Sequence, residues 1–141
     1  MKILFVCKGN VGRSQIAEAL LKKYHRLDSK SAGTVVSNPE KIKRLGELGE
    51  RVSTLFQSMK EEGIDLSKKK RKKITPEMVK EADKIIIMAD HETVPDFLKE
   101  DPKVIYWDVK DPEGKNLDFH RKTKEQLKGL IDNFVEIYQL K

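Results

Sequence analysis

The first hydrophobic segment of the chain, residues 2–6, is apolar at successive positions after its opening lysine. Such a run is typical of a strand buried on both faces, because a half-buried strand alternates apolar and polar positions. A glycine-rich turn follows it, and apolar residues then recur at helical spacing: Ile16, Ala17, Leu20, Leu21 and Tyr24. We therefore expect a buried strand, a loop and an amphipathic helix in that order.

Three later segments also predict strands. They cover residues 31–34, residues 84–88 and residues 104–107. The second of them contains the triplet Ile85-Ile86-Ile87, and β-branched residues favour the extended backbone. Because these segments are short and largely apolar, they resemble the strands of a sheet that is covered on both sides.

Helices are predicted between the strands from capping residues and apolar spacing. Asn38-Pro39-Glu40 has the composition of a helix start, and Gly46 and Gly49 interrupt the segment that follows. The next helix is expected to end at Gly63. Its apolar face is formed by Val52, Leu55, Phe56 and Met59.

Two more helices complete the pattern. Thr75-Pro76-Glu77 predicts one helix start, and Asp118 is the expected N-cap of a long terminal helix. The apolar stripe of that helix comprises Leu127, Leu130, Ile131, Phe134 and Ile137. Strands that alternate with helices favour an α/β fold with a parallel sheet, and 141 residues suffice for one domain.

The charge of the chain is concentrated in one place. Lys and Arg number 29 against 23 Asp and Glu, and residues 68–73 are six consecutive basic residues, so 23 of each sign remain outside that run. The net charge of +6 therefore does not by itself indicate a nucleic-acid-binding domain. The basic run is interpreted as a solvated loop, with attraction of acidic phosphoproteins or nucleic acid as alternatives.

Cysteine and histidine are too few for several kinds of site. A single cysteine excludes an intrachain disulfide or a zinc site of several thiolates. The three histidines, at positions 25, 91 and 120, lack metal-ligand spacing, so no metal is expected. No apolar stretch is long enough for a signal peptide or a membrane span, which predicts a cytoplasmic protein without a membrane partner.

The lone cysteine opens the most informative segment, Cys7-Lys8-Gly9-Asn10-Val11-Gly12-Arg13-Ser14. It lies between the first strand and the first helix, where ligands of α/β sheets bind. A Walker A loop needs four residues between its glycines, followed by Lys and Ser or Thr, and a dinucleotide loop needs a third glycine. Neither pattern is present, so a nucleotide loop is excluded.

The same segment fits an oxyanion cradle that contains a nucleophile. Glycine and asparagine tolerate the backbone angles that turn successive N–H groups toward one centre. The following helix directs its positive end to that centre, and Arg13 offers a planar fork for two oxygens. These features also favour a nucleophilic thiolate at Cys7, to which Ser14 can donate its hydroxyl.

The stretch from Val6 to Ser14 resembles the signature loop of low-molecular-weight protein tyrosine phosphatases, whose fold and loop are shared with thioredoxin-coupled arsenate reductases. The resemblance covers most of the chain through further segments: Ser31-Ala32-Gly33-Thr34, Gly63-Ile64-Asp65, Ile74-Thr75, residues 83–88 and Asp111-Pro112. It implies a single three-layer domain over residues 1–141. That domain would contain a four-stranded parallel sheet flanked by helices on both faces.

The resemblance also implies hydrolysis of a phosphate monoester without metal or cofactor. Cys7 is expected to form a phosphocysteine, Arg13 to hold phosphate oxygens, and Asp111 to act as general acid and then base, with Asp108 as the rival acid. The substrate is expected to be a phosphorylated protein or a small phosphate ester. The expected phosphate-binding residues, which would also hold inorganic phosphate, are Lys8, Gly9, Asn10, Val11, Gly12 and Ser14.

Some positions depart from the tyrosine phosphatase pattern. Glu113-Gly114 follows the Asp-Pro pair where tyrosines are common, and residues 25–55 contain no Phe, Trp or Tyr, which leaves tyrosine preference open. Residues 14–18 and 107–112 resemble the arsenate reductase branch, but the two further cysteines of that branch are missing. The alternatives are therefore an arsenate reductase-like enzyme resolved by an external thiol, or a non-catalytic protein that binds oxyanions or RNA through residues 68–73.

Overall fold

A four-stranded parallel sheet forms the centre of the computed structural model, which describes residues 1–36 and 43–140. The strands lie in the order β2-β1-β3-β4. Their bounds are β1 Ile3–Cys7, β2 Lys30–Gly33, β3 Lys84–Ile87 and β4 Val104–Tyr106. Every neighbouring pair is parallel, which confirms the predicted fold class and the predicted number of strands.

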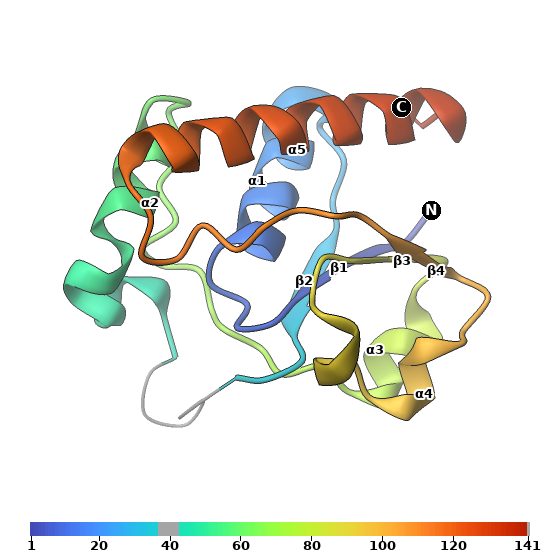
Figure 1. The fold of residues 1–141 in the computed structure, drawn as a ribbon. Coiled ribbons are helices and arrows are strands. Elements are labelled where there is room, and N and C mark those ends of the chain that lie inside the picture. Colours follow the sequence, from blue (N-terminus) through green and yellow to red (C-terminus); the bar gives the residue numbers. More distant parts are fainter. Residues whose placement is uncertain (37–42, 141) are drawn as a thin grey trace.

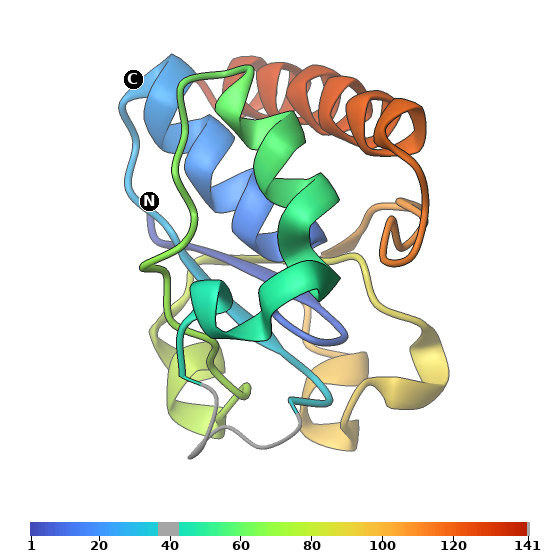
Figure 2. The ribbon, with the colours of Figure 1, turned by 90° about the vertical axis from the view of Figure 1, so that its left-hand side faces the viewer.

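Helices cover both faces of this sheet, as predicted. On one face lie α1 (Arg13–His25), α2 (Ser53–Lys60) and α5 (Leu117–Ile137), with α5 in contact with both of the others. On the opposite face lie the short helices α3 (Pro76–Glu81) and α4 (Asp96–Lys99). The two groups of helices are separated by the sheet in both ribbon views (Figures 1 and 2).

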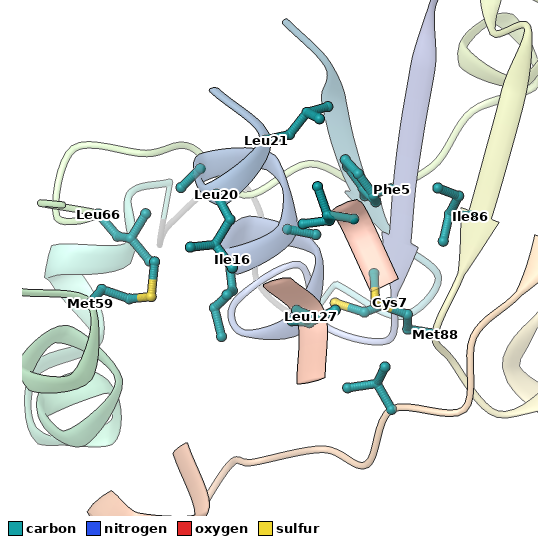
Figure 3. Close-up of a cluster of buried hydrophobic side chains, with 14 of the residues drawn as sticks. Phe5, Cys7, Ile16, Leu20, Leu21, Met59, Leu66, Ile86, Met88 and Leu127 are labelled. Atoms are coloured by element: carbon teal, nitrogen blue, oxygen red, sulfur yellow. The ribbon is translucent and has the colours of Figure 1, made fainter. Parts of the chain in front are cut away.

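The side chains of β1 explain why this strand is apolar at successive positions. Phe5 and Cys7 point into the core beneath α1, α2 and α5, whereas Leu4 and Val6 belong to the core beside α3 and α4. Figure 3 shows Phe5 and Cys7 in the first of these cores, with Met88 and Leu127 near the cysteine. Burial of alternate residues on opposite faces requires apolar side chains at every position.

The strand order places the carboxyl end of β1 at a topological switch point. From β1 the chain passes to β2 on one side, and it later adds β3 on the other side. Loops that leave neighbouring strands in opposite directions form a crevice between them, where ligands of open α/β sheets bind. Cys7 is the last residue of β1 and therefore lies at this crevice.

Most predicted strand boundaries agree with the structure to within a residue or two. The predicted N-cap of α5 is wrong. The N-cap is Asn116, whose side chain accepts a hydrogen bond from the N–H of Phe119, and not Asp118, which lies in the first turn. Ile137, expected on the buried stripe, is 62% exposed at the last helical position. The predicted cap Thr75 of α3 is confirmed, because its hydroxyl accepts from the N–H of Met78.

The segment between β2 and α2 differs from the predicted interrupted helix. The predicted start at residues 38–40 lies outside the described residues. The part that follows is the 3-10 helix η1 (Leu45–Val52), in which Gly49 has a φ of 62° that a regular helix does not contain. Two short elements after β3, η2 (His91–Thr93) and α4, were not predicted. No helix of the described residues is long and apolar enough to cross a membrane.

Candidate active site

The thiol of Cys7 lies at the base of the loop that joins β1 to α1. The residue is 2% exposed, and its Sγ atom lies 3.0 Å from the Oγ atom of Ser14. Ser14 stands in the first turn of α1, so its hydroxyl reaches back across the loop to the sulfur. A hydroxyl in this position can donate to a thiolate and stabilise it, as expected from the sequence.

Asn10 gives the loop its curvature. Its φ is 53°, in the left-handed region that asparagine tolerates better than most residues. The side chain is fully buried and donates to the hydroxyls of Ser14, at 2.8 Å, and Ser31, at 3.1 Å. Neither Asn10 nor Ser14 lines the active-site pocket, and the hydrogen bonds of their side chains fix the shape of the loop.

Arg13 is buried at the first position of α1, where the backbone N–H groups have no partner within the helix. Its Nη1 atom donates to the carbonyl oxygens of Met88, after β3, and Val109, after β4, the latter at 3.0 Å. These two bonds fix the guanidinium across the carboxyl ends of the strands. The Nη2 atom lies 3.7 Å from a carboxylate oxygen of Asp111.

The loop after β4 brings Asp111 to the cysteine loop. A Cβ atom on Gly12 would lie 3.6 Å from the ring of Pro112, so the two loops are in contact. The Asp111 carboxylate accepts from the N–H of Glu113 at 3.0 Å, and its side chain is 48% exposed. The rival acid Asp108 is exposed and does not line the pocket.

A small pocket of about 40 Å³ joins these groups. Six of the nine predicted site residues line it: Cys7, Gly9, Val11, Gly12, Arg13 and Asp111. The other three, Lys8, Asn10 and Ser14, do not line it. The volume is far below the roughly 300–1,000 Å³ of pockets that enclose a drug-sized ligand. It is suited to a single oxyanion group, and the rest of a substrate would lie outside.

Five lining residues are not among the nine predicted ones: Pro112 and Glu113 follow Asp111 directly, and Arg51, Leu55 and His120 come from other segments. His120 is 5% exposed and lies in the first turn of α5. Burial lowers the pKa of His120 below its ordinary value, although a hydrogen bond with the Pro112 backbone and the charge of Asp111 oppose the shift. The one sequence signal for His120 is its distance from Asp111. His120 follows Asp111 by only nine positions, so the start of α5 has to lie near the Asp-Pro loop.

The backbone of the basic run at residues 68–73 also supports the cysteine loop, a role that the charge of the run does not predict. The N–H of Lys72 donates to the Oδ1 atom of Asn10 at 2.8 Å. Gln15, which is 1% exposed, donates from its side-chain amide to the same Oδ1 atom and to the carbonyl oxygen of Lys70. Through these bonds the backbone of residues 70–72 is tied to the left-handed residue of the loop.

Among the residues that the structure describes, no group of three or more His, Cys, Asp or Glu side chains is arranged to hold a metal ion. The residues that line the pocket supply a thiol, a guanidinium, backbone N–H groups and a carboxyl group. A thiol beside an oxyanion cradle and a carboxyl group can perform nucleophilic displacement with proton transfer to the leaving group.

The known proteins that resemble this chain in sequence or structure include both phosphatases and arsenate reductases. An arsenate reductase of Brevibacillus brevis is 29% identical, over 95% of this chain and 93% of its own. A low molecular weight protein tyrosine phosphatase of T. tengcongensis is 31% identical, with a TM-score of 0.76 over 96% of this chain and 98% of its own. A variant of the YwlE arginine phosphatase with a phosphorylated active-site serine is 25% identical, with a TM-score of 0.79 over 99% of this chain and 97% of its own.

The family profile described as low molecular weight phosphotyrosine protein phosphatase matches residues 2–141. The match includes the cysteine loop, the Asp-Pro loop and all four strands. Geometry, structural neighbours and sequence thus agree, and the chain belongs to the low molecular weight phosphotyrosine protein phosphatase family.

Proposed function

We propose that this protein is a cysteine-dependent phosphatase that hydrolyses phosphotyrosine or related phosphate monoesters through a phosphocysteine intermediate. The observation that carries the proposal is the meeting of Cys7, Arg13 and Asp111 in one small pocket at the switch point of the sheet. Cys7 and Arg13 flank the loop after β1, Asp111 lies in the loop after β4, and each offers a group that phosphoryl transfer requires.

In the first step the Cys7 thiolate attacks phosphorus, and the bond between phosphorus and the ester oxygen breaks. The leaving oxygen takes its proton from the carboxyl group of Asp111, while Arg13 and the loop N–H groups hold the other phosphate oxygens. In the second step Asp111 accepts a proton from water, which attacks the phosphocysteine and releases inorganic phosphate. The Ser14 hydroxyl, 3.0 Å from the sulfur, stabilises the departing thiolate.

The residues that line the pocket bear on the choice of substrate. No Phe, Trp or Tyr lines the pocket within the described residues, so a substrate ring would find little aromatic surface there. Relatives include proteins named tyrosine phosphatase and arginine phosphatase. The informative panel therefore contains phosphotyrosine peptides, phosphoarginine and small phosphate esters.

The mechanism is tested by hydrolysis of p-nitrophenyl phosphate. Cys7→Ser and Arg13→Ala should each abolish turnover, and Asp111→Asn should lower kcat by roughly 10²–10⁴-fold, most with poor leaving groups. The matched control is Asp108→Asn, because Asp108 lies in the same loop but not at the pocket. Turnover of Cys7→Ser at the wild-type rate would show that the mechanism is wrong.

Arsenate reduction is a second candidate, supported by relatives named arsenate reductase. Cys7 is the only cysteine of the chain, so an external thiol has to resolve the arsenate adduct. The thiol would attack the Cys7 sulfur, the electron pair of the S–As bond would remain on arsenic, and arsenite would leave. A second thiol would then reduce the mixed disulfide. Thiol oxidation that depends on both arsenate and Cys7 would support this reaction.

A non-catalytic role has a different outcome in the same assays. Tight binding of phosphate or vanadate without turnover of any ester or of arsenate would indicate an oxyanion-binding protein. RNA retention that falls steeply with salt would point to the basic run at residues 68–73.

A further inference from the structure

An ion pair borders the mouth of the active-site pocket. Arg51 belongs to η1 and Glu113 to the Asp-Pro loop, so the pair joins two segments that lie far apart in the sequence. Both residues line the pocket together with Cys7. Their side chains are 44% and 45% exposed, which places the pair on the solvent side of the buried thiol. A substrate whose phosphate lies in the loop has to pass beside these two charges.

The ion pair uses only part of the Arg51 guanidinium. The hydrogen bond to Glu113 is donated by Nε. Within residues 1–36 and 43–140 the Nη1 and Nη2 atoms donate no further hydrogen bond. Two parallel N–H groups of an arginine are the usual bidentate donors to a carboxylate or a phosphate. Glu113 thus holds the arginine from one side and leaves a second edge open at the pocket.

The charges around the pair favour an anion at that edge. Arg71 is buried close enough that the positive charge of Arg51 contributes, after burial, to lowering the pKa of Arg71, whereas Glu113 raises it. Arg51 at the mouth and Arg13 at the base both line the pocket, so two guanidinium groups face a ligand there.

We propose that Arg51 is a subsite for a second negative charge on the substrate. The preferred substrates are phosphate esters whose leaving group carries a further carboxylate or phosphate near the phosphate to be cleaved. Glu113 is a positioning residue that orients Arg51 through Nε. The inference rests on the proposed function in one respect, because the first phosphate has to occupy the loop around Cys7.

Binding of non-hydrolysable phosphonates separates this subsite from catalysis. The probes are benzylphosphonates with a carboxylate at ring position 3 or 4, and their uncharged carbamoyl counterparts, with Kd measured by calorimetry at pH 7. At least one carboxylate should bind about 3-fold tighter than its carbamoyl partner, the range of an exposed charge pair. Arg51→Gln should abolish this preference, and Arg51→Lys should retain part of it.

Two further variants sharpen the assignment. Glu113→Gln keeps an acceptor for Nε but removes the competing negative charge, so the preference for the carboxylate should increase. A decrease would show that the charge of Glu113 does not compete with the ligand for Arg51 and would overturn the proposal. Arg121→Gln is the matched control, because Arg121 forms an ion pair of similar exposure with Glu61 and does not line the pocket. Its preference should equal that of the wild type.

The outcomes distinguish the subsite from the proposed function. Equal affinity for carboxylate and carbamoyl probes at both ring positions, or a preference that survives Arg51→Gln, overturns the subsite even if p-nitrophenyl phosphate is hydrolysed. A preference that depends on Arg51 supports the subsite even if no ester is hydrolysed.

The source of the second charge is resolved with phosphotyrosine peptides bound to Cys7→Ala, flanked by Glu or by Gln. Tighter binding of the Glu peptides would identify an acidic polypeptide as the source. Equal peptide affinities together with a carboxylate preference among the phosphonates would identify a small ester.

Discussion

Gly33, the last residue of β2, is the position at which the fold restricts the cysteine loop most directly. An added Cβ atom would lie 2.7 Å from the carbonyl oxygen of Lys8 and 2.9 Å from the backbone nitrogen of Asn10. Both atoms belong to the backbone of the loop and cannot turn aside as a side chain can. The methyl group of Gly33→Ala needs about 3.4 Å for ordinary contact, so the loop has to move by about 0.7 Å.

The cost of this movement can be estimated from both stability and catalysis. Overpacking of a filled site typically destabilises a protein by about 1–3 kcal/mol. A displacement of 1 Å in catalytic geometry can lower the rate about 100-fold, so a shift of this size should lower kcat/KM by about 10-fold or more. The loss should exceed what destabilisation alone produces, because at 25 °C the folded state remains the major species.

The assay measures kcat/KM for p-nitrophenyl phosphate and the free energy of unfolding in urea for each variant. Gly129→Ala is the matched control, because Gly129 is exposed within α5 and its added Cβ would meet no atom within 4 Å. That variant should gain about 0.5–1 kcal/mol of stability with unchanged kcat/KM. Wild-type stability and activity in Gly33→Ala would refute the steric argument.

Two further predictions concern buried polar groups. Burial keeps the pKa of His120 below its ordinary 6.5, so the unfolded chain binds its proton more readily and stability falls as the pH decreases below about 6.5. His120→Gln should flatten the pH dependence of the unfolding free energy by up to about 1.4 kcal/mol per unit, and parallel curves would contradict the assignment. Lys124, 3% exposed, donates to the Ser58 carbonyl at 2.9 Å and pairs with Glu62, so Lys124→Met should cost about 2 kcal/mol in urea unfolding. Lys122→Met, exposed on the same helix, should change stability by less than about 0.5 kcal/mol, and equal losses would show that burial of the cation is irrelevant.

The fold could be predicted where one physical cause fixes both the pattern and the structure. The continuous apolar runs of β1 and β3 arise because each strand separates two cores. Capping was less predictable: Asn116 and Asp118 are both good caps, and only the extended backbone at Asn116 selects between them. The helix α4 has four residues, too few for a helical period to show in the sequence.

Some residues of the candidate site could likewise be predicted from the sequence and others could not. Cys7 and Arg13 were predictable because their loop is a single local segment whose spacing expresses its geometry. Asp111 required the family resemblance, because an Asp-Pro pair is also common in ordinary turns. Arg51 and His120 approach the pocket from other parts of the chain, so no local pattern indicates them.

The basic run shows how a composition statistic and a structural role can be independent of each other. The side chains of residues 68–73 account for the whole net charge, yet the contacts with the cysteine loop are made by backbone atoms at residues 70–72. The carbonyl oxygen of Lys72 also accepts from the N–H of Gly33, which continues β2 toward the loop. Any side chain could form these bonds, so the support of the loop does not explain why the residues are basic. The net charge of the chain and the support of the cysteine loop therefore have separate causes, although the same six residues carry both.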